Sequence, residues 1–210
     1  MCPTPTFHSE EPIVPASSTP LNQIASRLLT HAGLPLDAPI LDLGSSSASF
    51  LDDLLAQGYT NLIAANLSPG ALEVHQQQLG PVQAERVLWL VDDVTQARHL
   101  PQLGPVLLWH DRAMLRVLTL PVHLTAYRQL LDHMVEPGQG WVMLSVALPG
   151  GPLREGDFLA HPYELSQLAA FLGGGYALID HQPYVHTLPS GELQRNVYAL
   201  FQRRALSLVA

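Results

Sequence analysis

The chain has 210 residues, 47% of them hydrophobic, and a net charge of −8 with no basic cluster, which suits one domain with a buried core and argues against a nucleic-acid partner. No run approaches the roughly 20 apolar residues that cross a bilayer, and the start, MCPTPTFHSEEP, carries no export signal, so we expect a cytoplasmic protein without a membrane partner. The single cysteine, Cys2, excludes an intrachain disulfide, the scattered histidines lack metal-ligand spacing, and the absence of lysine removes Schiff-base and Walker-type chemistry.

The first part of the chain divides into an arm and a helix. Residues 1–17 are rich in Pro, Ser, Thr and Glu, which is typical of a flexible N-terminal arm. We expect this arm to precede one domain over 18–210. Apolar residues recur at helical spacing from Thr19 to His31, and Gly33 follows as a stop. The domain is therefore predicted to open with an amphipathic helix.

Strands and helices then alternate. Buried runs predict five strands, each bounded by turn residues, at 39–44, 60–66, 86–91, 105–109 and 140–148. Helices with one apolar face lie between most of them, and Ser68 and Pro69 mark the start of one. A segment of loop composition at 149–157 precedes a helix from about 162 to 172. The last segments predict an antiparallel pair, at 176–187 and 192–204.

This alternation predicts the fold class, because parallel neighbours need a helical crossover and that crossover is right-handed. We expect an α/β protein with a Rossmann-like, doubly wound sheet of about seven strands. The sheet is mostly parallel and ends in a C-terminal antiparallel hairpin. No internal repeat or linker divides the domain.

The candidate site lies in the turns after the first four strands, since ligands of such sheets bind outside the carboxyl ends of the strands. The turn after the first strand consists of small residues, which lets a ligand approach backbone amides at the start of the next helix. In chain order the candidate residues are Asp42, Gly44, Ser45, Ser46, Asn66, Leu67, Asp93, Val94, Trp109, His110, Asp111 and Arg112.

Taken in order over about 38–204, these turns resemble a class I S-adenosylmethionine-dependent methyltransferase. The first motif of that family is similar to PILDLGSSSASFLDDLL, the second to IAANLSPGALE and the third to LVDDVT. A WHDRA-like block of a bacterial small-molecule subgroup is similar to LLWHDRAMLRVLT. The turn into the fifth strand matches VEPGQGWVML, and the closing hairpin matches VHTLPSGELQRNVYALFQRR. Six motifs in the right order make the resemblance specific.

The resemblance implies S-adenosylmethionine as the cofactor and a small molecule as the methyl acceptor. By position, Asp42 and Gly44 shape the methionine end of the pocket, together with Ser45 and Ser46. Asn66 and Leu67 follow the second strand, where Asn66 meets the ribose, and Asp93 with Val94 frames the adenine. Trp109 is counted with the cofactor residues, although a strand tryptophan also suits the core.

The same resemblance places the reacting end of the site after the fourth strand. Asp111 and Arg112 lie near the transferred methyl group and the acceptor, and His110 or Asp111 is the candidate general base. The alternative for Asp111 and Arg112 is a helix-start cap with a surface ion pair. The alternative for Ser45 to Ser47 is an ordinary helix cap.

Departures from the family pattern affect the cofactor loop. Two family glycines are Ser45 and Ser46 here, and the acidic ribose-binding residue is Asn66, which predicts weaker cofactor binding. We expect an active methyltransferase, and the alternative is a catalytically inactive, methyltransferase-like binding or regulatory protein. A nicotinamide oxidoreductase is disfavoured because no G-x-G-x-x-G follows the first strand. The sequence carries no signal of oligomeric state.

Overall fold

A computed structural model of the chain describes residues 20–45, 50–112, 114–151, 154–155, 158–159, 161–188 and 190–205. The predicted arm over 1–17 and the candidate residue Ser46 lie outside these ranges. Within them, no helix combines the length and apolar character that a membrane span requires.

One seven-stranded sheet organises the chain, with the order β3-β2-β1-β4-β5-β9-β8. The first five strands are parallel, whereas β9 is antiparallel to both β5 and β8. The doubly wound sheet with a closing hairpin is thus confirmed. Its strands are β1 (Ile40–Leu43), β2 (Leu62–Asn66), β3 (Val87–Val91), β4 (Leu108–Asp111), β5 (Trp141–Ala147), β8 (Tyr176–Thr187) and β9 (Leu193–Arg203).

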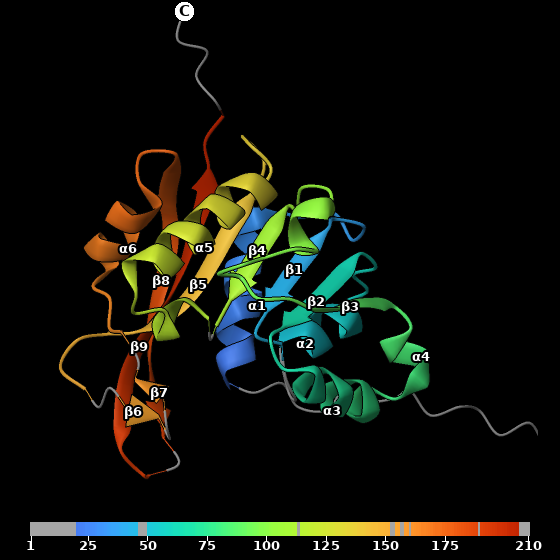
Figure 1. Ribbon diagram of the computed structural model, residues 1–210, viewed down its shortest axis with the longest axis horizontal. Helices are drawn as coiled ribbons and strands as arrows, with labels where there is room; N and C mark the ends of the chain where they lie inside the picture. The colour runs from blue at the N-terminus through green and yellow to red at the C-terminus, as the bar shows by residue number, and fades with distance from the viewer. Residues whose placement is uncertain are drawn as a thin grey trace, which may run out of the picture.

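Helices cover both faces of the sheet and create two hydrophobic cores. One core joins α1 and α2 to the strands, and the other joins α5 and α6 to the opposite face. Figure 1 shows α5 crossing in front of β5 and β4, with α1 behind them. The helices are α1 (Pro20–Ala32), α2 (Phe50–Ala56), α3 (Pro69–Leu79), α4 (Pro81–Ala84), α5 (Pro121–Met134) and α6 (Leu165–Leu172), with short 3-10 turns η1 (Leu100–Gln102) and η2 (Leu115–Val117).

Local sequence explains several of these boundaries. The side chain of Ser68 accepts a hydrogen bond from the backbone N–H of Ala71, and Pro69 occupies the first turn, so α3 begins where the sequence predicts. Helix α6 begins with a capping box between Glu164 and Gln167. Both caps satisfy N–H groups that a helix start leaves without partners.

Three local features differ from the sequence prediction or add to it. Strand β4 begins at Leu108 and ends at Asp111, so His110 and Asp111 are strand residues and not the turn that follows. The predicted loop over 149–157 contains β6 (Arg154–Glu155), which pairs with β7 (Phe158–Leu159). The β3-to-β4 crossover has no α-helix and uses η1 instead.

Candidate functional site

A buried pair of side chains joins β1 and β4. Asp42 and His110 are register partners on these neighbouring strands, so they project from the same face of the sheet. Oδ1 of Asp42 lies 2.6 Å from Nδ1 of His110, and Nε2 of His110 lies 3.2 Å from the hydroxyl of Tyr198. All three side chains are buried. Both ring nitrogens of His110 are therefore engaged within the chain.

The hydroxyl of Tyr198 fixes the hydrogen-bond pattern of His110. Burial raises the pKa of Tyr198 above its ordinary value, so the phenol keeps its proton at neutral pH. We infer that Tyr198 donates to Nε2, which leaves the proton of a neutral imidazole on Nδ1. Nδ1–H then donates to Asp42 and aligns its carboxylate. His110 thus lacks a free nitrogen with which to act directly as a general base.

The second carboxylate oxygen of Asp42 has a different environment. Oδ2 is buried and has no hydrogen-bond partner within the described part of the chain. Burying a carboxylate oxygen without a donor is costly, so such an atom marks a place for a ligand donor. Gly44 follows two residues later with a φ of 69°, a conformation that glycine adopts without strain and that turns the chain away from β1.

Asp111 projects from the opposite face of the sheet and serves as a cap. Its carboxylate accepts hydrogen bonds from the backbone N–H groups of Met114 (2.7 Å) and Leu115 (2.9 Å) and from the hydroxyl of Tyr127 (2.6 Å). Burial, followed by the negative charge of Asp111, raises the pKa of Tyr127. These contacts match the capping alternative, because they commit both carboxylate oxygens to the turn after β4.

Trp109 lies in the core of the protein. Its side chain is fully buried, and its Nε1–H donates to the hydroxyl of Tyr127 at 3.0 Å. The ring packs edge-on against the ring of Tyr127. This placement matches the alternative that Trp109 is a core residue, and its one polar atom is already bonded within the chain.

Arg112 connects the end of β4 to helix α1. Its Nη1 lies 3.4 Å from the side-chain oxygen of Asn22, and its side chain is partly buried. Burial raises the pKa of Tyr198, and the positive charge of Arg112 acts in the opposite direction and lowers it. The guanidinium therefore lies near that phenol. Arg112 is consequently the positive charge at the carboxyl end of β4.

Asn66 ties together the turns after β1 and β2. Its Nδ2–H donates to the carbonyl oxygen of Ser45 at 2.8 Å, and its Oδ1 accepts from the backbone N–H of Ser68 at 2.9 Å. The amide thus stabilises two neighbouring turns. Its predicted ribose contact has to use the remaining hydrogen-bonding capacity of the amide, because one donor and one acceptor site are occupied.

Ser45 also binds a histidine that the sequence analysis did not select. Its Oγ lies 3.2 Å from Nδ1 of His75, and Nε2 of His75 lies 2.7 Å from Oδ1 of Asp52. His75 is fully buried on α3 and packs edge-on against Trp89. The one sequence signal for His75 is its position three residues after Leu72, on the buried face of α3.

A hollow of about 320 Å³ lies at the carboxyl ends of β2 and β3. Leu67 and Asp93, two of the predicted cofactor residues, both line it. The Leu67 side chain is 56% exposed and offers an apolar surface. Asp93 accepts hydrogen bonds from the backbone N–H (2.8 Å) and hydroxyl (2.7 Å) of Thr95, which orders the turn. The structure thus brings together residues from two of the predicted turns.

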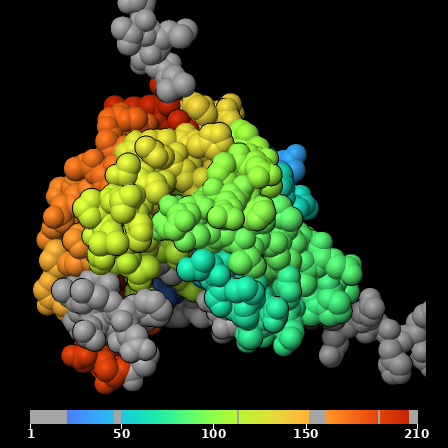
Figure 2. Space-filling view, viewed as in Figure 1, coloured from blue at the N-terminus to red at the C-terminus, as the bar shows by residue number. Residues whose placement is uncertain are grey.

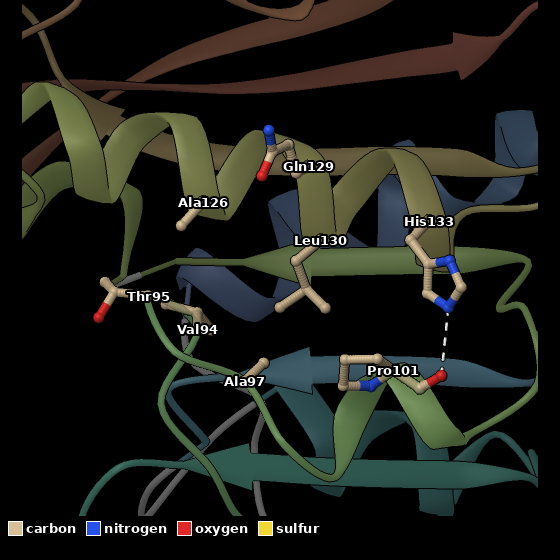
Figure 3. A pocket seen from close by; sticks show the side chains of 8 residues that line it. All are labelled: Val94, Thr95, Ala97, Pro101, Ala126, Gln129, Leu130 and His133. Atoms are coloured by element: carbon tan, nitrogen blue, oxygen red, sulfur yellow. Dashed lines mark hydrogen bonds between the residues drawn. The ribbon is translucent and has the colours of Figure 1, made fainter.

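Val94 faces a second groove, between α5 and the crossover that follows β3. This groove has a volume of about 280 Å³. Figure 3 shows Leu130 of α5 facing Val94 and Ala97 of the crossover, with Nε2 of His133 directed at the carbonyl oxygen of Pro101. Figure 2 shows the surface of α5 directly beside that of the crossover segment. Val94 is itself 3% exposed and contributes to the core.

Within the ranges that the structure describes, no three His, Cys, Asp or Glu side chains gather closely enough to hold a metal ion.

Comparison with known proteins gives matches to solved structures. No protein-family model matches the chain, and no curated protein sequence matches it. A methyltransferase described as S-adenosylmethionine-dependent, from Methanosarcina mazei, is 13% identical with a TM-score of 0.68, over 85% of this chain and 98% of that one. The N-methyltransferase NodS from Bradyrhizobium japonicum is 16% identical with a TM-score of 0.64, over 88% and 96% of the two chains.

A third similar structure holds ligands. The 1,6-didemethyltoxoflavin-N1-methyltransferase from Burkholderia thailandensis, with 1,6-didemethyltoxoflavin and S-adenosylhomocysteine bound, is 20% identical with a TM-score of 0.65. The match covers 90% of this chain and 80% of that one. At these identities the likeness establishes the fold, which is that of the class I S-adenosylmethionine-dependent methyltransferases.

Proposed function

We propose that the protein is an S-adenosylmethionine-dependent methyltransferase that acts on a small-molecule acceptor. The observation that carries the proposal is the buried Oδ2 of Asp42, which has no partner among the described residues. It lies at β1, next to β4, where the strand order reverses direction. In open α/β sheets, ligands bind at this reversal point.

The residues at the carboxyl ends of these strands fit the two ends of the cofactor. S-adenosylmethionine would supply an electrophilic methyl group on a sulfonium. Oδ2 of Asp42 would accept a hydrogen bond from the ammonium group at the methionine end. The exposed Leu67 and the hollow that it shares with Asp93 would receive the nucleoside end. His110 is then a positioning residue, because its contact with Oδ1 orients the carboxylate of Asp42.

The acceptor end of the proposed site centres on Arg112. Methyl transfer is an in-line displacement, which depends on orientation more than on a protein nucleophile. The Arg112 guanidinium, anchored to Asn22 on α1, would bind a carboxylate or another hydrogen-bond acceptor of the small molecule. The commitments of His110 and Asp111 to contacts within the chain argue for an acceptor that needs no strong protein base. The likeness to the 1,6-didemethyltoxoflavin-N1-methyltransferase supports a small-molecule acceptor.

Calorimetry with S-adenosylmethionine and S-adenosylhomocysteine tests the proposal. We expect binding of both, and we expect Asp42→Asn to weaken it about 10- to 100-fold, as loss of a charged hydrogen bond does. Asp37→Asn, which removes an exposed carboxylate from the turn before β1, is the matched control and should leave affinity unchanged. No heat and no thermal shift at millimolar ligand would rule the proposal out.

Product formation separates the enzyme from the alternative of an inactive binding protein. An active enzyme releases S-adenosylhomocysteine when a panel of small acceptors is supplied, and Arg112→Ala should reduce that release. Binding of the cofactor without turnover of any acceptor would favour a regulatory protein with the same fold.

A further inference from the structure

A further hollow, of about 450 Å³, lies at the end of the sheet opposite the candidate site. It is formed where β9 ends and β8 begins, next to the C-terminal ends of α5 and α6. Three of the chain's ten basic residues line it, namely Arg128, Arg203 and Arg204, in a protein whose net charge is −8. This concentration of positive charge runs against the charge of the whole molecule.

The one acid that lines the hollow is already neutralised. Asp132 pairs with Nε of Arg128 at 3.0 Å through one oxygen, and its other oxygen accepts from the hydroxyl of Tyr176 at 2.8 Å. Three guanidinium groups and one carboxylate therefore leave two positive charges, those of Arg203 and Arg204. A phosphate monoester or a similar dianion carries the complementary charge.

The guanidinium of Arg203 is held in place before any ligand binds. Its Nη1 donates to the carbonyl oxygens of Asp132 (2.6 Å) and Val135, at the end of α5. The guanidinium also lies 5.9 Å from the centre of the Tyr176 ring. Within the described part of the chain these bonds use one of its three nitrogens, so the others are open to an oxyanion.

Hydrogen-bonded backbone forms the rest of the hollow's wall, and the space beside its glycines is open. The backbone N–H of Arg204 donates to the carbonyl oxygen of Gly175 at 2.8 Å, and its carbonyl oxygen accepts from the N–H of Gly138 at 3.2 Å. The Arg204 side chain is exposed and therefore projects from a fixed frame. A Cβ placed on Gly174 or Gly175 would meet no atom within 4 Å. The volume is within the range of sites for small organic ligands.

We propose that this hollow binds a small phosphate-bearing anion through the guanidinium groups of Arg203 and Arg204. The site is separate from the proposed methyl-transfer site and does not depend on it. The ligand class is a phosphate ester or polyphosphate, since planar guanidinium groups match the paired oxygens of such groups.

Titration with inorganic pyrophosphate at constant ionic strength, followed by calorimetry, tests the proposal. We expect saturable binding of one pyrophosphate, weakened about fivefold or more by Arg204→Gln, with an intermediate effect of Arg204→Lys. Because Arg204 is exposed, its variants should retain the thermal stability of the parent. Arg195→Gln is the matched control, because Arg195 is an exposed arginine on β9 that does not line this hollow.

Two results would overturn the proposal. One is the absence of saturable binding at millimolar pyrophosphate. The other is an equal loss of affinity in Arg195→Gln and Arg204→Gln, which would show that the anion responds only to the overall charge of the protein.

Discussion

Nδ1 of His75 lies 3.2 Å from Oγ of Ser45, and this contact joins helix α3 to the turn that follows β1. At position 45 the resemblance to the methyltransferases predicts a glycine, whereas this chain has a serine whose hydroxyl has a buried partner. His75 is held in turn by Asp52 on α2. Ser45 therefore belongs to a hydrogen-bonded chain that runs through two helices.

Truncation of His75 is expected to weaken both the fold and cofactor binding. His75→Ala should cost about 2–4 kcal/mol of unfolding free energy, because it leaves a cavity and two polar groups without partners. His75→Asn keeps a polar atom near Nδ1 and should retain more affinity for S-adenosylhomocysteine than His75→Ala. Chemical denaturation and calorimetry measure the two effects, with the exposed His181→Ala as control. Equal affinities of the Ala and Asn variants would contradict the contact's role.

Asn66→Asp is expected to destabilise the turns after β1 and β2, which the Asn66 amide connects. From sequence alone, restoring an acidic residue should tighten cofactor binding if the ribose lies there. The structure reverses this expectation, since Nδ2 of Asn66 donates to the carbonyl oxygen of Ser45 and a carboxylate oxygen cannot. We predict a loss of about 1–3 kcal/mol in unfolding free energy and no gain in affinity. Tighter binding of S-adenosylhomocysteine by this variant would show that the contact is dispensable.

The carboxylate of Asp92 stabilises the crossover after β3 in a pH-dependent manner. Burial alone would raise its pKa, but backbone N–H donors from Leu100, Arg98 and His99 outweigh burial and lower it. A lowered folded-state pKa gives stability that is present above the unfolded value, about 3.9, and is lost as pH falls through the folded value. Asp92→Asn should be less stable than the parent at pH 7, and the gap should narrow below about pH 4. A gap that stays constant on acidification would contradict this account.

Tyr127 and Tyr163 provide a matched pair of hydroxyl deletions. Tyr127→Phe leaves the buried Nε1–H of Trp109 without its acceptor and Asp111 without one donor, so we expect a loss of about 1–3 kcal/mol. The hydroxyl of Tyr163 is buried with no hydrogen-bond partner among the described residues, so Tyr163→Phe should be neutral or stabilising. Thermal unfolding compares the two. Similar destabilisation by both would contradict the role assigned here to the hydrogen bonds of the Tyr127 hydroxyl.

The parts of the fold that the sequence predicts are those with local causes. Ser68 and Pro69 mark the start of α3 because a cap involves residues within one turn. The end of β4 is misplaced because His110 and Asp111 are polar, and polar residues usually end a buried strand. They remain in the sheet because Asp42 and Tyr127, from distant parts of the sequence, form hydrogen bonds with their polar side-chain atoms.

The same reason explains which site residues the sequence misses. His75 and Tyr198 contact Ser45 and His110 across separations of 30 and 88 residues. No spacing rule connects residues that meet only when the sheet forms. The resemblance to family motifs predicts Asp42, Leu67 and Asp93 as site residues, whereas the partners that orient these turns are seen in the tertiary structure alone.

The central claim is that the carboxyl ends of β1, β2 and β4 bind S-adenosylmethionine, and a crystal structure with millimolar S-adenosylhomocysteine tests it most directly. We predict that the ligand's amino group lies within hydrogen-bond distance of Oδ2 of Asp42 and that its nucleoside lies against Leu67. Side chains packed into that space, with the ligand absent or bound at another edge of the sheet, would contradict the claim.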